Sequence, residues 1–92
     1  MRFKYDEKKN EKLRRDPRRK IGFEEVQEIW EHDHYVDWRS DDPAQFRAIG
    51  WVKNKLYSVI YEIREDKDGE YCHLVTLWKS TKQERKLYEE NT

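Results

Sequence analysis

Apolar and polar residues alternate along much of the chain, and two stretches near the N-terminus change to a helical period. Phe3 and Tyr5 alternate with cations, which predicts a short strand. Asp6 is a suitable N-cap for a helix over residues 7–15, and Pro17 is expected to end that helix. This part of the chain is therefore predicted to form a strand, a helix and a basic turn.

A second helix is predicted over residues 23–31, because four side chains recur at the spacing of one helical face. They are Phe23, Val26, Gln27 and Trp30. Alternation then predicts four strands, over residues 34–39, 46–52, 56–64 and 71–78, with turns at residues 40–43, 53–55 and 65–69. Gly50 is expected to bend the second of these strands.

A last helix is predicted over residues 82–90, because Thr81 and Glu84 have the spacing of a capping box. The order of elements indicates an α+β fold with a mainly antiparallel sheet, two N-terminal helices and one C-terminal helix. Helices are expected to cover one face of the sheet. Residues 1–92 are long enough for one domain with a small core.

Charged residues make up 43% of the chain and hydrophobic residues only 35%, a balance that approaches that of disordered proteins. The net charge of zero and an aromatic content of 14% favour a folded domain with a thin aromatic core instead. Cys72 is the one cysteine, so an internal disulfide is excluded and a reducing cytoplasm is expected. No apolar run has the length of a membrane span, and the N-terminus does not resemble a signal peptide.

Positive and negative charges are segregated along the chain. Residues 1–20 carry ten Lys and Arg against four acids, whereas residues 21–46 carry one Arg against eight acids. A basic run is formed by Lys12, Arg14, Arg15, Arg18, Arg19 and Lys20. Two interpretations stand: a site for a phosphate backbone, or a solvated helix end with cations near its negative pole.

Other side chains also have two interpretations. His73 is suited to acid–base chemistry on a sheet face or to a half-buried structural role, and alternation places it with Leu77, opposite Cys72. The cluster His32-Asp33-His34 fits a helix end better than a metal site, because no further ligand has a suitable spacing. The core rather than base stacking is expected for Trp30, Trp38, Trp51 and Trp78, unless one of them is exposed.

Several short motifs occur together in an order and spacing that resemble the BrnT family. They are Phe3, Tyr5, Asp6 and Lys9; Phe23-Glu24-Glu25; Arg47 followed by Ile49-Gly50; and Lys79, Thr81, Glu84-Arg85 and Tyr88. The resemblance extends over nearly the whole chain. BrnT proteins are small toxins of bacterial type II toxin–antitoxin pairs and are similar in fold to RelE-type ribonucleases.

This resemblance implies a RelE-like fold and a ribonuclease that needs no metal or other cofactor and inhibits translation. The expected catalytic side chains are Lys79, Arg85, Tyr88, His73 and Arg47, and the expected RNA contacts are Arg14, Arg15, Arg18, Arg19 and Lys20. The implied partners are RNA, free or on the ribosome, and a BrnA-like ribbon-helix-helix antitoxin. Binding to DNA is implied only for the complex with the antitoxin, and no membrane is involved.

The chain departs from the family pattern in three places. The family commonly has Lys-His-Gly before its Phe-Glu-Glu motif, where this chain has Lys20-Ile21-Gly22. It commonly has Ser-Ala-Arg-Lys before the last helix, where this chain has Thr76-Leu77-Trp78-Lys79, and an upstream strand arginine corresponds to His73. The losses of cations and of a proton carrier leave an alternative open: a non-catalytic module that binds RNA or the ribosome, or docks a partner, with the same fold.

Overall fold

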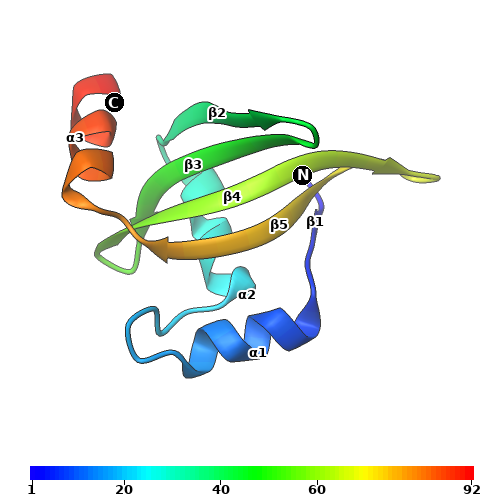
Figure 1. Cartoon of the computed structure of the whole chain (residues 1–92), viewed down its shortest axis with the longest axis horizontal. Coiled ribbons are helices and arrows are strands. Elements are labelled where there is room, and N and C mark those ends of the chain that lie inside the picture. Colours follow the sequence, from blue (N-terminus) through cyan, green and yellow to red (C-terminus); the bar gives the residue numbers. More distant parts are fainter.

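Five strands form one mixed sheet in the order β1-β5-β4-β3-β2, in a computed structural model that describes residues 1–92 (Figure 1). The strands are β1 (Phe3–Lys4), β2 (Tyr35–Asp41), β3 (Ala44–Val52), β4 (Lys55–Asp66) and β5 (Gly69–Lys79). The helices are α1 (Glu7–Arg15), α2 (Phe23–Val26), which continues as the 3₁₀ helix η1 (Gln27–Glu31), and α3 (Lys82–Asn91). The fold is therefore α+β, and none of its helices is long and apolar enough to cross a membrane.

The strand pairings are only partly those expected from the sequence. Strands β2 to β5 pair antiparallel with their neighbours, as the short turns predict. Strand β1 lies parallel to β5, with Phe3 opposite Cys72, and this pairing was not predicted. The strands are also longer than predicted, because alternating residues on both sides of each turn continue the pairing up to the turn itself.

Helices α2 and η1 pack on the core through side chains that are three residues apart in the sequence. After Val26 the α-helix tightens into a 3₁₀ helix, in which residues three apart lie on one face. Phe23, Val26 and Ile29 are consequently fully buried, while Gln27 and Trp30 are half-buried. In this second half the predicted inner face was only partly right, since Trp30 packs against the core but Ile29 was missed, because the prediction assumed a regular α-helix throughout.

A buried amide joins α1 to the start of α2. The Asn10 side chain, 5% exposed, accepts a hydrogen bond of 2.6 Å from the backbone N–H of Phe23. Gly22 lies beside it, and a Cβ added there would approach Asn10 Oδ1 to 2.3 Å. The close contact of the two helices thus requires a glycine at the N-cap and an acceptor on α1.

A β-bulge at Val75 determines which side chains of β5 share a face. Thr76 lies opposite Ile60, and Leu74 lies opposite Tyr61, so Val75 is an extra residue that has no partner in β4. Leu77 therefore lies in the core with Cys72, and Trp78 lies on the same face as His73. The predicted grouping of His73 with Leu77 was wrong, because simple alternation assumes a strand without a bulge.

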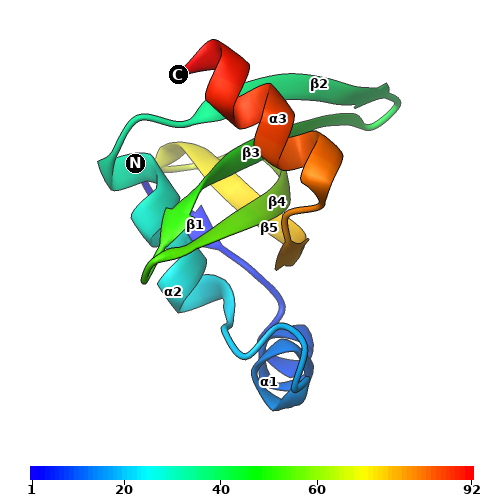
Figure 2. The same cartoon turned by 90° about the vertical axis from the view of Figure 1, so that its left-hand side faces the viewer.

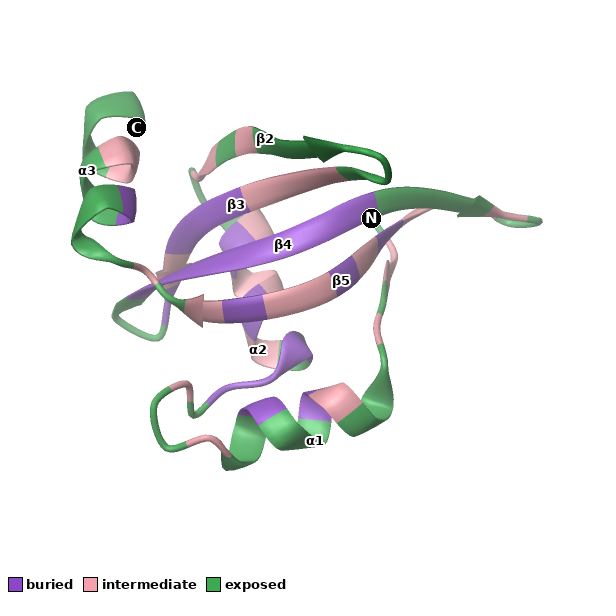
Figure 3. Cartoon of the chain, in the orientation of Figure 1, coloured by how far each residue is buried: buried purple, intermediate pink, exposed green.

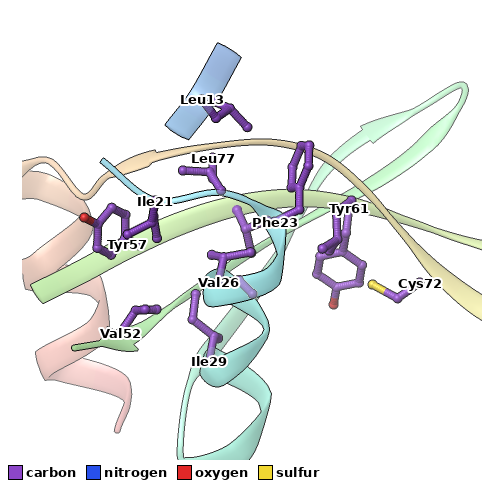
Figure 4. Close-up of a cluster of buried hydrophobic side chains, with 13 residues drawn as sticks. Leu13, Ile21, Phe23, Val26, Ile29, Val52, Tyr57, Tyr61, Cys72 and Leu77 are labelled. Atoms are coloured by element: carbon purple, nitrogen blue, oxygen red, sulfur yellow. The ribbon is translucent and has the colours of Figure 1, made fainter. Parts of the chain in front are cut away.

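Helices cover both faces of the sheet, and not one face as predicted. The core face carries Val59 and Leu77 and packs against α1, α2 and η1 (Figure 4). The opposite face, called here the α3 face, carries Arg47 and Trp78, which contact Glu84 of α3 (Figures 1 and 2). Burial is concentrated along the middle of β4 and the adjoining parts of β3 and β5 (Figure 3).

Two further expectations are corrected. Gly50 does not bend its strand: the β3–β4 register is continuous there, and a Cβ would approach Ile29 Cγ2 to 2.9 Å, so the glycine permits close packing of η1. The core position expected for the tryptophans holds only for Trp30, which packs against the core, whereas Trp38 is 65% exposed and Trp51 and Trp78 are half-buried on the α3 face. Indole surface is therefore available for contacts with other molecules.

Replacing Asn10 tests the joint between α1 and α2. Asn10→Ala leaves the buried Phe23 N–H without an acceptor, so the free energy of unfolding is expected to fall by about 1–3 kcal/mol. Urea denaturation followed by circular dichroism measures this change. Glu11→Ala, an exposed change on the same helix, is the control, and an equal effect of both changes would contradict the role of Asn10.

Candidate nucleic-acid interface

A pocket of about 280 Å³ lies between the loop that joins α1 to α2 and the end of β5. Its lining residues are Arg18, Arg19, Trp78 and Lys79. Strand β1 pairs only with Cys72 and His73, so this end of β5 has no neighbouring strand on the side away from β4. The loop fills part of that space, since Arg19 Nε donates a 2.8 Å hydrogen bond to the carbonyl of Leu77.

The two arginines of the pocket have different roles. Arg19 forms an ion pair with Asp16 at 2.5 Å, and its carbonyl accepts a 2.9 Å hydrogen bond from the Tyr57 hydroxyl. It therefore holds the loop against the sheet. Arg18 is 87% exposed, and its guanidinium is 3.6 Å from Asp16, so it can turn toward a ligand. A hydrogen bond from the Arg18 backbone N–H, together with these cations, lowers the pKa of Asp16.

Three lysines concentrate positive charge beside the pocket. The charge of Lys55 lowers the pKa of Lys79, and Lys20 contributes in the same direction. No carboxylate forms a salt bridge with any of these three lysines. An anion bound here would relieve their mutual repulsion, which makes the pocket suitable for phosphate.

Lys55 was not among the residues singled out from the sequence. It begins β4, immediately after the turn at Lys53 and Asn54, and it approaches Lys79 only because Tyr57 lies opposite Lys79 in the register. A prediction of the β4–β5 register would have found it. The bulge at Val75 shifts that register, so the turn sequence alone does not lead to it.

Arg85 and Tyr88 meet, as their spacing on a helix predicts, but they meet away from Lys79. The Arg85 guanidinium lies 5.3 Å from the ring centroid of Trp51, and the Tyr88 ring packs edge-on against the same indole at 6.2 Å. Trp51 is on the α3 face, whereas Lys79 lies opposite Tyr57 on the core face. These candidates therefore form two groups.

Arg47 is occupied by internal ion pairs. Its side chain, 12% exposed, donates to both carboxylate oxygens of Asp37 and, at 3.2 Å, to Glu84. The hydrogen bonds to Asp37 raise the pKa of Arg47 above its ordinary value. Glu84 also accepts from the Trp78 indole N–H at 2.9 Å and from the Thr81 N–H at 2.8 Å, as the predicted capping box requires. Arg47 and Glu84 thus hold α3 and orient Trp78.

His73 lies in the middle of β5, far from the pocket. In the sheet, His73 lies opposite Glu62 and Lys4. His73 precedes Lys79 by six residues, a separation of roughly 20 Å along a strand. Burial lowers its pKa, so the neutral imidazole is favoured. The structure does not bring His73 together with the other proposed catalytic residues.

The remaining basic residues lie along α1. Arg14 forms ion pairs with Glu24 at 3.3 Å and Glu25 at 3.0 Å, so its charge is largely compensated. Arg15, 81% exposed, forms only a 3.8 Å contact with Glu11. Three of the five predicted RNA contacts are therefore exposed and weakly paired or unpaired: Arg15, Arg18 and Lys20. The other two, Arg14 and Arg19, form ion pairs within the protein.

Comparison with known proteins assigns no family. Neither the scan of protein-family models nor the search of curated proteins gives a match to the chain.

Removal of the Glu84 carboxylate tests its structural role. Glu84→Ala leaves the Thr81 N–H, the Trp78 indole and one side of Arg47 without an acceptor, so the free energy of unfolding is expected to fall by about 1–3 kcal/mol. Chemical denaturation measures the loss. Glu89→Ala on the exposed side of α3 is the matched control, and a loss no larger than in this control would disprove the role of Glu84.

The lowered pKa of His73 predicts a dependence of stability on pH. Below its ordinary pKa of 6.5, the unfolded chain takes up a proton that the folded chain resists, so folding stability decreases as the pH falls from about 6.5 toward 5. Thermal unfolding across this range should show the decrease, and His73→Gln should reduce it. His32→Gln at the exposed end of η1 is the control. An unchanged pH dependence in His73→Gln would contradict the assignment.

Proposed function

We propose that the chain is a BrnT-like toxin with a RelE-like fold, a metal-independent endoribonuclease that inhibits translation in the cytoplasm. The family motifs and the geometry of the pocket support this proposal independently. The single observation that carries it is the group of cations around the pocket: Arg18 and Lys79 line it, and Lys20 and Lys55 add positive charge beside Lys79.

The pocket has the features needed to hold a nucleotide of single-stranded RNA. Cations attract the phosphate, and an indole at the same place offers a surface on which a base can stack. The Trp78 ring is kept in one orientation by its hydrogen bond to Glu84, so stacking would cost little conformational entropy. The aromatic side chain stands where the family commonly has an arginine, and stacking replaces an ionic contact there.

The proposed reaction uses the ribose 2′-hydroxyl as its nucleophile. Its oxygen attacks the adjacent phosphorus, the bond from phosphorus to the 5′-oxygen breaks, and the 2′ proton goes to a base while the leaving oxygen receives a proton. Cations stabilise the charge that develops on the phosphate. Lys79, whose pKa the neighbouring lysines lower, is the pocket residue best suited to exchange a proton.

A BrnA-like ribbon-helix-helix antitoxin is the proposed partner that neutralises the toxin. On this proposal DNA is bound by the complex and not by the toxin alone. RNA, free or on the ribosome, is the proposed target.

A second function is favoured by a specific observation. Arg47 is occupied by Asp37 and Glu84, His73 lies far along the strand, and Arg85 lies against Trp51. The catalytic candidates are therefore dispersed, while the cations and Trp78 remain together. This arrangement is what a module that binds RNA or the ribosome without cleaving it requires.

Incubation of the purified chain with a labelled single-stranded RNA, with chelator present, separates the two functions. We expect cleavage that Lys79→Ala reduces by about 100-fold or more, the usual contribution of a residue that transfers a proton. Lys67→Ala in the exposed β4–β5 turn is the matched control, because it removes the same charge far from the pocket (Figure 1). Loss of cleavage in Arg85→Ala but not in Lys79→Ala would move the reaction to the Trp51 side of the sheet.

Other results have defined meanings. Intact RNA that binds in a salt-sensitive manner, with a salt slope reduced by about one in Lys79→Ala, would establish the binding module. An absence of both cleavage and binding, with normal growth when the folded chain is overproduced, would refute both functions.

A further inference from the structure

Strand β2 exposes an apolar strip at the edge of the sheet opposite the pocket. Val36 is 41% exposed and Trp38 is 65% exposed, and both project to the core face of the sheet. On this face Val36 and Trp38 are left uncovered, and β2 is largely exposed along its length (Figure 3). Half-buried Phe46 lies opposite Trp38 on β3, and exposed Ile63 follows on β4, so the strip continues inward.

The outer side of β2 has no strand beside it. It is the last strand in the order of the sheet, and β3 is its only partner. A shift in register between Trp38 and Ser40 marks a bulge at Arg39, which ends the regular part of the edge. Alternate residues within 35–38 therefore present unpaired backbone N–H and C=O groups at the edge, beside the exposed apolar side chains.

Acidic side chains flank this edge at both ends. They are Glu31 and Asp33 before the strand and Asp41 and Asp42 at its end, all exposed and none in a salt bridge. Arg39 is the one cation along the strand. The surface therefore attracts a basic segment, and a second copy of the same edge would bring two acidic surfaces together.

We propose that β2 binds an extended, basic segment of a partner protein as an added strand. The backbone of the segment pairs with residues 35–38, its alternate apolar side chains cover Val36 and Trp38, and its basic side chains lie against the flanking acids. The surface is three strand positions from the pocket, about 14 Å across the sheet, so the proposal does not depend on the cleavage of RNA.

The probe for this surface is a synthetic peptide of about eight residues in which lysine and valine alternate. A second peptide carries N-methyl groups on alternate backbone amides, which removes the ladder donors and keeps every side chain. Calorimetric titration of the whole chain is expected to show binding of the first peptide and a loss of at least about tenfold for the methylated one. Equal affinities, or no binding of either peptide, would overturn the proposal.

Variants of the chain locate the peptide. Trp38→Ser is expected to weaken binding by about tenfold, and so is the pair Asp41→Asn and Asp42→Asn. The pair Glu7→Gln and Glu11→Gln on α1, both exposed, removes the same charge far from β2 and should leave the affinity unchanged. If Trp38→Ser impairs folding, the methylated peptide still decides the question with the unaltered chain.

Two measurements distinguish strand addition at β2 from peptide binding at the pocket and from self-association of the chain. Lys79→Ala should bind the peptide as the unaltered chain does, whatever its effect on RNA, and a loss of peptide binding in this variant would place the peptide at the pocket and overturn the proposal. Sedimentation of the chain alone should show a monomer, whereas a dimer that Trp38→Lys dissociates would assign the edge to a second copy and overturn the proposal.

Discussion

The buried carboxylate of Glu84 joins the first turn of α3 and the adjoining end of β5 to β3, which is distant in sequence. It accepts from the first turn of α3, from the indole of Trp78 on β5, and from Arg47 on β3. Glu84 anchors the first turn of α3, and Arg85 and Tyr88 pack the rest of the helix against Trp51 of the sheet. A buried carboxylate is costly unless it is fully paired, and here the helix N-terminus and a guanidinium supply the pairing.

The same ion pairs affect how the family resemblance is interpreted. Arg47 and Glu84 both belong to the matched motifs, and both have a structural role that is sufficient to explain their presence. Among the residues that line the pocket, Lys79 and Arg18 remain available to a ligand, and Trp78 lies beside them. Some positions of the motifs, such as Arg47 and Glu84, therefore hold the fold together, whereas others, such as Lys79, face the pocket.

Local features of the fold were accessible from the sequence. The helix over residues 7–15, the N-cap at Asp6 and the Thr81–Glu84 capping box were all predicted and are confirmed, because each depends on residues a few positions apart. The buried position of Ile29 was not predicted, since the second half of the helix predicted over residues 23–31 is a 3₁₀ helix.

The candidate site was less accessible from the sequence, because it depends on the register of distant strands. The bulge at Val75 exchanges the faces of the residues that follow it, so Lys79 and Trp78 point to opposite sides from those that alternation gives. Lys55 approaches Lys79, and α3 covers the α3 face, only in the assembled sheet. A pattern of neighbouring residues in the sequence does not predict such contacts.

The parallel pairing of Phe3 with Cys72 has a consequence for the synthesis of the protein. The first strand finds its partner only near the end of the chain, and contacts between such distant residues form late in folding. An emerging chain therefore holds its N-terminal strand unpaired until β5 has been synthesised. The pocket, shared by the α1–α2 loop and the end of β5, cannot form before Lys79 has been synthesised, so a ribosome that has not yet reached this residue carries no assembled site.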